Sequence, residues 1–209
     1  MRKLITEFIG TFFLILTIGL VVVGGKGDLA PLAIGSALMV MIFAGAHVSG
    51  AHYNPAVTLA VLIRGRINIA DAIGYWAVQF VAAVAAAYTV IFLLHDKMPA
   101  VATAMTDTTR ALVAEIIGTF ALCYVVLNVA TAKGTVGNMF YGLAIGFTVL
   151  AMAYALGGIS GGAFNPAVAI GVSFMKLADW SNVWVYLVGC FGGAVIAAIV
   201  FKVINADDI

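Results

Sequence analysis

The chain has 209 residues, of which 64% are hydrophobic and only 9% are charged, and its formal net charge is +1 at pH 7. Soluble domains are about 25% charged, so this composition indicates an integral membrane protein with the lipid bilayer as its first expected partner. The low net charge, with basic residues scattered singly or in pairs, excludes a nucleic-acid-binding surface.

The first half of the chain contains three apolar segments long enough to cross a bilayer, which takes about 20 residues in a helix. We expect these spans near residues 4–23, 31–48 and 70–94. The first follows Met1-Arg2-Lys3 and therefore begins like a signal peptide. Its apolar run is too long for one and lacks a small-x-small cleavage site, so we interpret it as a retained span.

Between the second and third spans lies the stretch GAHVSGAHYNPAV, residues 45–57. The apolar segment 56–63 that follows is too short to cross a bilayer and too apolar for a solvent loop. It is therefore predicted to be a half-span that re-enters the membrane. Asn as the N-cap, followed by Pro at the first helical position, is typical of a helix start, so Asn54-Pro55 should begin this short helix.

The second half has the same plan after a polar linker at residues 95–110. Its expected spans lie near 111–130, 139–156 and 183–203. The stretch LGGISGGAFNPAV precedes the third of these, and Asn165-Pro166 should begin a second half-helix over 167–175.

The two halves are an internal repeat. EFIGTF at 7–12 matches EIIGTF at 115–120 with an offset of 108 residues, while AIG at 33–35 and NPAV at 54–57 recur with an offset of 111. Because each half has three spans, the halves 1–95 and 110–209 enter the membrane from opposite sides within one channel domain, 1–209. In such inverted repeats the functional site lies near the midplane where the halves meet.

Two helix starts that meet at mid-membrane have a definite chemistry. Each helix N-terminus carries roughly half a positive charge, and the asparagine amides offer donors. Unwound backbone before each asparagine turns carbonyl acceptors into a lumen, which favours neutral hydrogen-bonding molecules and repels cations. The predicted donors and helix starts are Asn54, Pro55, Ala56, Asn165, Pro166 and Ala167, and the predicted lining carbonyls belong to Gly50, Ala51, His52, Gly161, Gly162 and Ala163.

These motifs resemble the aquaporin and glycerol-facilitator family, the major intrinsic proteins. ExxGT opens spans one and four, and SGAHYNPAVT and SGGAFNPAV are in register within the repeat, so that the resemblance covers essentially the whole chain. It implies an all-α fold, a right-handed bundle of six membrane helices with two re-entrant half-helices. It also implies a homotetramer with one pore per subunit.

The chain departs from the family after the second NPA motif. Most members carry Arg there, where it narrows the outer mouth, and this chain has Val168. Family spacing places the outer filter at Ile34, Ala153, Gly162 and Val168. None of these side chains forms hydrogen bonds, so we expect a wide, apolar filter.

Other polar residues are assigned structural roles or none. The resemblance implies that Glu7 and Glu115 are buried and bind loop backbone, and it places His52 beside the pore on the cytoplasmic side. No metal ligand set, cofactor loop or catalytic pair is evident, and Cys123 and Cys190 are given no chemistry. Six basic residues are assigned to one side against four on the other, which favours cytoplasmic termini by the positive-inside rule; the six are Arg2, Lys3, Arg64, Arg66, Lys133 and Lys202.

The predicted function is a passive, gradient-driven channel for water or small uncharged solutes such as urea, ammonia or glycerol, in the cell membrane and not an enzyme. Two alternatives remain. A secondary transporter also uses inverted repeats and broken helices, but the only acids within spans, Glu7 and Glu115, lie near the span ends. The other alternative is a structural membrane protein with a closed pore.

Overall fold

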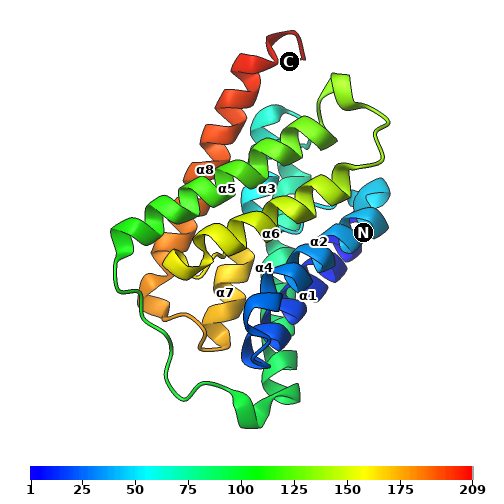
Figure 1. Ribbon diagram of the computed structural model, residues 1–209. Coiled ribbons are helices and arrows are strands. Elements are labelled where there is room, and N and C mark those ends of the chain that lie inside the picture. The colour runs from blue at the N-terminus through cyan, green and yellow to red at the C-terminus, as the bar shows by residue number, and fades with distance from the viewer. Residues whose placement is uncertain (209) are drawn as a thin grey trace.

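Within residues 1–208 the protein consists of six long α-helices and two short ones, and Figure 1 shows how they are arranged. The structure is a computed structural model and describes residues 1–208. In chain order the α-helices are α1 Arg2–Val23, α2 Ala30–Ser49, α3 Pro55–Arg64, α4 Ile69–Leu93, α5 Thr108–Ala130, α6 Tyr141–Ser160, α7 Pro166–Phe174 and α8 Val183–Ile204. Five single 3₁₀ turns join or end them: Gly27–Leu29, His95–Lys97, Lys133–Thr135, Trp180–Asn182 and Ala206–Asp208.

The six long helices are apolar and long enough to span a membrane, which confirms the predicted spans. The boundaries differ by a few residues, most at the end of α6, which was expected near residue 156 and continues to Ser160. Gly157 and Gly158 do not break this helix. It ends instead at Gly161, whose left-handed backbone (φ 91°) forms the C-cap, a conformation that glycine adopts without a Cβ penalty.

The two halves contact each other through the crossing of α2 and α6 and through the packing of the half-helices. Helices α2 and α6 cross at Gly35 and Gly146, where a Cβ on either residue would lie within 2.7 Å of the other's carbonyl oxygen. Glycine at both positions therefore allows the backbones to touch. Each half-helix packs chiefly on the last long helix of the opposite half, α3 on α8 and α7 on α4, and the two halves share one hydrophobic core.

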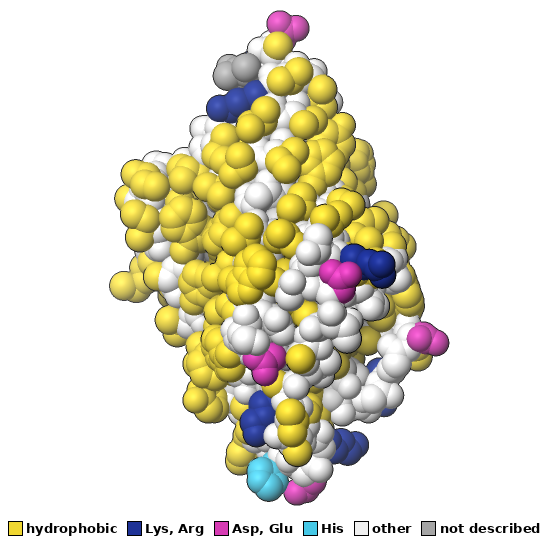
Figure 2. Space-filling view, turned by 90° about the vertical axis from the view of Figure 1, so that its left-hand side faces the viewer, with side chains coloured by type: hydrophobic (Ala, Val, Ile, Leu, Met, Phe, Trp, Pro, Cys, Tyr) yellow, Lys and Arg dark blue, Asp and Glu magenta, His cyan; other side chains and the backbone are white. Residues whose placement is uncertain are grey.

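Most of the outer surface is apolar. Figure 2 shows hydrophobic side chains over wide areas of one face, with few charged ones among them. One end of the bundle carries both termini, the end of α3 and the connection between α5 and α6; we call it the terminal face. The opposite end carries the 94–107 linker, and we call it the linker face.

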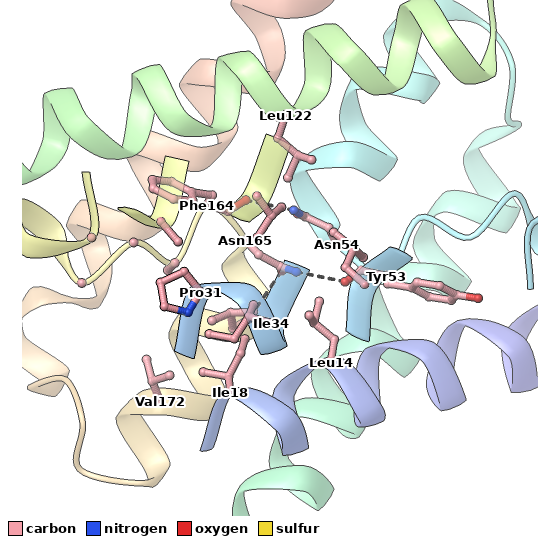
Figure 3. A pocket seen from close by; sticks show the side chains of 18 of the residues that line it. Leu14, Ile18, Pro31, Ile34, Tyr53, Asn54, Leu122, Phe164, Asn165 and Val172 are labelled. Atoms are coloured by element: carbon pink, nitrogen blue, oxygen red, sulfur yellow. Dashed lines mark hydrogen bonds between the residues drawn. The ribbon is translucent and has the colours of Figure 1, made fainter. Parts of the chain in front are cut away.

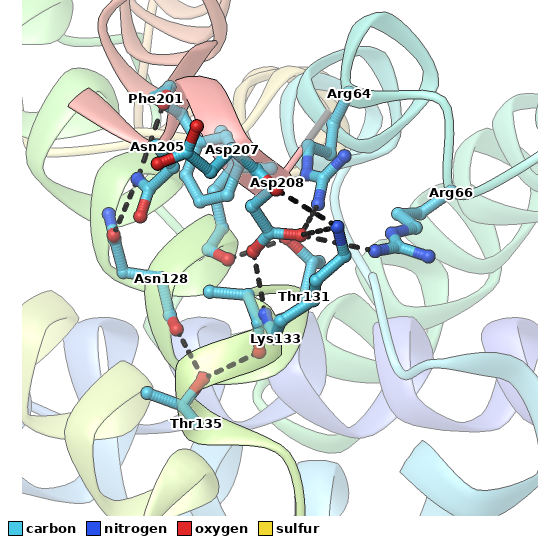
Figure 4. A network of polar contacts seen from close by, with 12 residues as sticks. Arg64, Arg66, Asn128, Thr131, Lys133, Thr135, Phe201, Asn205, Asp207 and Asp208 are labelled. Atoms are coloured by element: carbon cyan, nitrogen blue, oxygen red, sulfur yellow. Dashed lines mark hydrogen bonds and ion pairs between the residues drawn. The ribbon is translucent and has the colours of Figure 1, made fainter. Parts of the chain in front are cut away.

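A polar cluster joins three segments at the terminal face (Figure 4). The Asp208 carboxylate accepts hydrogen bonds from Arg64 Nη2 at 2.7 Å and from the Lys133 backbone N–H at 2.6 Å. Arg66 reaches the same carboxylate at 3.4 Å. The Arg64 guanidinium also lies over the Phe201 ring, 4.8 Å from its centroid. Arg64 was counted among the basic residues expected on the cytoplasmic side, and its side chain is buried where it contacts Phe201 of α8 and Asp208.

We expect Asp208→Asn to lower the thermal stability of the purified protein at pH 7. The Lys133 N–H and the nearby Arg64, Lys133 and Arg66 charges hold the pKa of Asp208 below its usual range. A depressed carboxyl pKa contributes stability above the unfolded-state value of about 3.9, and this stability is lost as the pH falls through the lower folded-state pKa. Thermal unfolding in detergent should therefore separate the two proteins at pH 7, and the difference should shrink progressively as the pH falls below about 4.

Asp207→Asn is the matched control, since the Asp207 side chain is exposed. An equal effect of both substitutions would show that charge in the tail, and not the Arg64 contact, sets the stability.

Candidate functional site

The site is built on the first turns of the two half-helices. Asn54 has extended backbone, and its Oδ1 accepts the N–H of Ala56 at 2.8 Å. Asn165 makes the same contact with the N–H of Ala167 at 2.9 Å. These N-caps accept backbone N–H groups of the first turn, which have no partner inside the helix. The gain in stability is greatest where the N–H groups are buried away from solvent. The sequence prediction of two Asn-Pro helix starts therefore matches the observed bounds of α3 and α7.

The two asparagines also join the halves to each other (Figure 3). Asn54 Nδ2 donates to the Phe164 carbonyl oxygen at 2.9 Å, and Asn165 Nδ2 donates to the Tyr53 carbonyl oxygen at 2.9 Å. A side-chain amide has two N–H donors. Each asparagine thus spends one donor across the contact between the halves and retains a second beside the cavity.

Two fully buried glutamates hold the backbone that precedes the asparagines. Glu115 accepts the N–H groups of Ala163 at 3.0 Å and Phe164 at 2.7 Å. Glu7 accepts those of His52 at 2.9 Å and Tyr53 at 2.7 Å. The free energy gained is large at this depth because an unpaired N–H in an apolar bundle costs several kcal/mol.

Further residues that the sequence analysis missed support these glutamates. Ser49 and Ser160 donate to Glu7 and Glu115 at 2.7 and 2.6 Å. A tyrosine then binds each serine carbonyl, Tyr75 at 2.6 Å and Tyr186 at 2.7 Å. All these pairs are related by the offset of 111 already found in the NPA motifs, so aligning the halves over their whole length would have detected them.

One pair in this shell differs between the halves. Gln79 Nε2 donates to Glu7 at 3.0 Å, whereas its counterpart Cys190 places Sγ 3.5 Å from Glu115. Cys190 is therefore a weak donor to Glu115, although the sequence analysis assigned it no chemistry. A thiol is a weaker donor than an amide. Glu115 in the second half is therefore held less strongly at this position than Glu7 in the first half.

The loop backbone turns its donors and acceptors in opposite directions. Gly50 and Gly161 have φ of 88° and 91°, and Tyr53 and Phe164 have φ of 49° and 47°. Directly after the two glycines, the Ala51 and Gly162 N–H groups donate to the hydroxyls of Ser49 and Ser160. The next two N–H groups of each loop donate to the glutamates. Among residues 1–208, no hydrogen bond reaches the carbonyl oxygens that were predicted to line the pore, those of Gly50, Ala51, His52, Gly161, Gly162 and Ala163. These oxygens remain available as acceptors.

A cavity of about 410 Å³ runs through the middle of the bundle and opens toward the linker face. Asn54 and Asn165 line it at its centre. All four outer-filter residues border the same cavity, namely Ile34, Ala153, Gly162 and Val168. The prolines and alanines of the NPA motifs do not line it, because they form the buried first turns of α3 and α7.

Most of the cavity wall is apolar and comes from the long helices. The sequence analysis did not identify these wall residues, which are Leu14, Ile18, Leu38, Leu122, Val126 and Val149. In α1 and in α5 the two residues are four positions apart, and the offsets of 108 and 111 pair all six across the halves. A second space of about 500 Å³ opens at the terminal face, and Gly50 lines this one and not the central cavity.

His52 lies between the two spaces and lines both. Its Nδ1 is 3.1 Å from Thr58 Oγ1, and its ring packs edge-on against Tyr75 with centroids 5.1 Å apart. These contacts fix the orientation of the imidazole. The site can therefore pass a file of neutral hydrogen-bonding molecules between fixed donors, fixed acceptors and an apolar wall.

Comparison with known proteins finds a matching family model, relatives in sequence and a similar solved structure. A family model described as Major intrinsic protein matches residues 1–201. Glycerol uptake facilitator protein-like 6 of Lactiplantibacillus plantarum is 37% identical over 100% of this chain and 100% of its own length. Aquaporin NIP1-1 of Oryza sativa subsp. japonica is 37% identical over 98% of this chain and 74% of its own. The X-ray structure of the aquaglyceroporin from Plasmodium falciparum matches with a TM-score of 0.87 and 26% identity over 98% of this chain and 97% of that chain.

We expect Glu115→Gln to loosen the second loop alone. Gln presents an amide donor where Glu115 accepts, so one backbone N–H loses its partner, at a cost of about 1–3 kcal/mol or roughly 5- to 150-fold in local opening. Hydrogen exchange by mass spectrometry should show this acceleration at Ala163 and Phe164.

Glu7→Gln is the matched variant and should instead accelerate exchange at His52 and Tyr53. If either substitution opened both loops equally, the two glutamates would not act as separate supports.

Proposed function

The chain belongs to the major intrinsic protein family, and from this premise we propose that its outer filter admits uncharged solutes larger than water, of the size of urea and glycerol. Family membership makes the chain a multi-pass integral membrane protein and a passive channel for water and small solutes. The proposal concerns which solutes pass.

The observation that carries this proposal is the chemistry of the outer filter. Its four residues border the cavity and carry no charge and no hydrogen-bonding side chain. An Arg at position 168 would add five N–H donors and a fixed charge, and Val168 adds neither. A solute with an apolar carbon skeleton therefore meets a compatible wall on one side and the carbonyls of Gly161 and Gly162 on the other.

The centre of the channel supports selection for neutral molecules. Two half-helix N-termini face the cavity, each equivalent to roughly half a positive charge. Asn54 and Asn165 each retain an N–H there, and most of the residues that line the cavity are apolar. A cation would lose its hydration shell against a positive potential, so ions are disfavoured even without a filter arginine.

The alternatives find less support. A coupled transporter needs a carboxylate or ion site that changes partners, but Glu7 and Glu115 are occupied by backbone and side-chain donors. A permanently closed structural protein would not need a cavity of about 410 Å³ with aligned donors. The name of one relative, a glycerol uptake facilitator, and that of the structural neighbour, an aquaglyceroporin, favour solutes of glycerol size.

We also infer the assembly and orientation. Residues 1–209 form one channel unit with halves 1–95 and 110–209, four units form a homotetramer, and both termini lie in the cytoplasm at the cell membrane. Exposed aromatic side chains on the long helices, such as Phe43, Phe147 and Tyr154, suit packing against neighbouring subunits or lipid. Arg66 and Lys133 at the terminal face are among the basic residues that favour this orientation.

Val168→Arg should reduce urea and glycerol permeability by roughly tenfold or more and water permeability much less, because narrowing a pore penalises the larger solute first. Stopped-flow light scattering on proteoliposomes measures all three fluxes in one preparation. Val168→Met controls for side-chain size without charge. An unmodified channel that passes water and excludes both larger solutes would reject the proposed substrate class.

Mercurials should inhibit the unmodified channel weakly, because both cysteines are buried and away from the cavity wall. Ala153→Cys should confer strong inhibition, since Ala153 lines the cavity in regular helix. Gly162 is the less suitable position for this test: its φ is 66° and a Cβ there would lie 3.1 Å from Gly157 Cα. Inhibition of the unmodified protein that Cys190→Ala abolished would instead place Cys190 at the pore.

A further inference from the structure

The internal repeat gives the outer filter a counterpart on the other side of the asparagines. The offset of 111 relates Ile34, Ala153, Gly162 and Val168 to four residues that line the same central cavity nearer the terminal face. We call these four the inner ring; they are Ile145, Ile42, Ala51 and Val57. Both rings consist entirely of apolar residues, and they stand at equivalent places in the two halves.

The two rings differ in size. Two of the four positions are equal, with isoleucine and valine in both rings. At the other two the inner ring is larger, since Ile42 corresponds to Ala153 and Ala51 corresponds to Gly162. Isoleucine has three more side-chain carbons than alanine. With a shared backbone plan, the inner ring must enclose the narrower opening.

Solvent exposure gives the same order independently. The inner-ring residues are all buried, with Ile42 at 2%, Val57 at 3%, Ile145 at 5% and Ala51 at 7% exposed. In the outer filter only Val168 is buried, and the other three residues are of intermediate exposure. This order agrees with the larger side chains of the inner ring and with the position of the outer filter at the end where the cavity opens toward the linker face.

The two spaces meet beside the inner ring. The central cavity opens toward the linker face, and the terminal-face space adjoins it. Among residues 1–208, His52 and Val126 alone line both. The counterpart of His52 is Ala163, so this end carries an imidazole where the outer end carries a methyl group. In one pair the larger side chain lies at the outer end: Ile18 corresponds to Val126 nearer the terminal face. These two side chains differ by a single carbon.

We propose that the size limit of this channel lies at the inner ring, with Ile42 as the residue that sets it, and not at the outer filter. The inference rests on the proposed function, since it takes the outer filter to be wide. Solutes admitted at the linker face would then be sorted after they pass the asparagines, by apolar side chains and the fixed ring of His52. The two rings differ in their role because the same position of the repeat holds isoleucine in one half, Ile42, and alanine in the other, Ala153.

The test exchanges the two residues that differ most. Proteoliposomes carrying the unmodified channel, Ile42→Ala, Ala153→Ile or both substitutions are assayed by stopped flow with water, urea, glycerol and erythritol. Ile42→Ala should raise glycerol and erythritol permeability by roughly threefold or more while water changes less, because pore diameter limits the larger solute most. Ala153→Ile makes the outer filter match the inner ring except at Gly162, which corresponds to Ala51. It should therefore reduce glycerol flux by no more than about half, as two similar barriers in series would.

Two conservative valine substitutions, Ile42→Val and Ile15→Val, distinguish an effect on the pore from an effect on packing. Ile42→Val removes one carbon and should raise glycerol flux to a smaller extent. Ile15→Val makes the same change at a residue that is also buried but lies off the cavity, and it should leave all fluxes unchanged. If both valine variants raised glycerol flux alike, loosened packing would explain the result and the inference would be overturned.

The outcomes separate this inference from the proposed function. If the unmodified channel passes glycerol, Ile42→Ala has no effect and Ala153→Ile blocks the flux, the limit lies at the outer filter and only the inference fails. If the unmodified channel excludes glycerol and Ile42→Ala admits it, the inner ring is the limit and only the proposed substrate class fails. If glycerol enters only after Ile34→Ala, the outer filter is narrow and both fail.

Discussion

Two stretches of non-helical backbone lie at the centre of an apolar bundle, and the rest of the structure depends on pairing their polar groups. Membrane proteins tolerate such backbone only where it is buried in protein or lines a wet cavity. Here Glu7 and Glu115 take the N–H groups of one loop each. The asparagine caps take the first N–H groups of the half-helices and bind the opposite loop. Without these contacts the loops could not remain at mid-membrane.

The way in which these groups are paired also creates the channel chemistry. N–H groups of the loop backbone donate to buried carboxylates, and within residues 1–208 no hydrogen bond reaches the carbonyl oxygens of residues 50–52 and 161–163. Each asparagine uses its oxygen and one N–H for structure and has one N–H left. In our proposal, a permeating molecule meets the groups that the structural hydrogen bonds leave unpaired. Their positions are fixed by a buried network and need not reorganise when a solute passes.

The repeat explains the architecture, whereas our proposal assigns the selectivity to differences between the halves. Glycines at 35 and 146 let α2 and α6 touch, and both halves share this solution. Gln79 against Cys190, His52 against Ala163 and Ile42 against Ala153 are not shared. A channel with two identical halves would present the same barrier twice. Unequal side chains on an equivalent backbone give each end its own chemistry without altering the fold.

The sequence by itself determined the six spans, the two half-helices, the inverted repeat and the paired Asn-Pro starts. These features depend on local patterns, namely the length of apolar runs, helix-capping residues and a constant offset between matching motifs. The outer-filter positions, in contrast, needed family spacing. Only the tertiary structure decided that Arg64 turns inward to Asp208, that Cys190 contacts Glu115, and which carbonyl each asparagine binds. The Asn54 and Phe164 partners are 110 residues apart, and such contacts form only when the packing of the two halves brings distant segments to one point, a distance that no local pattern along the chain encodes.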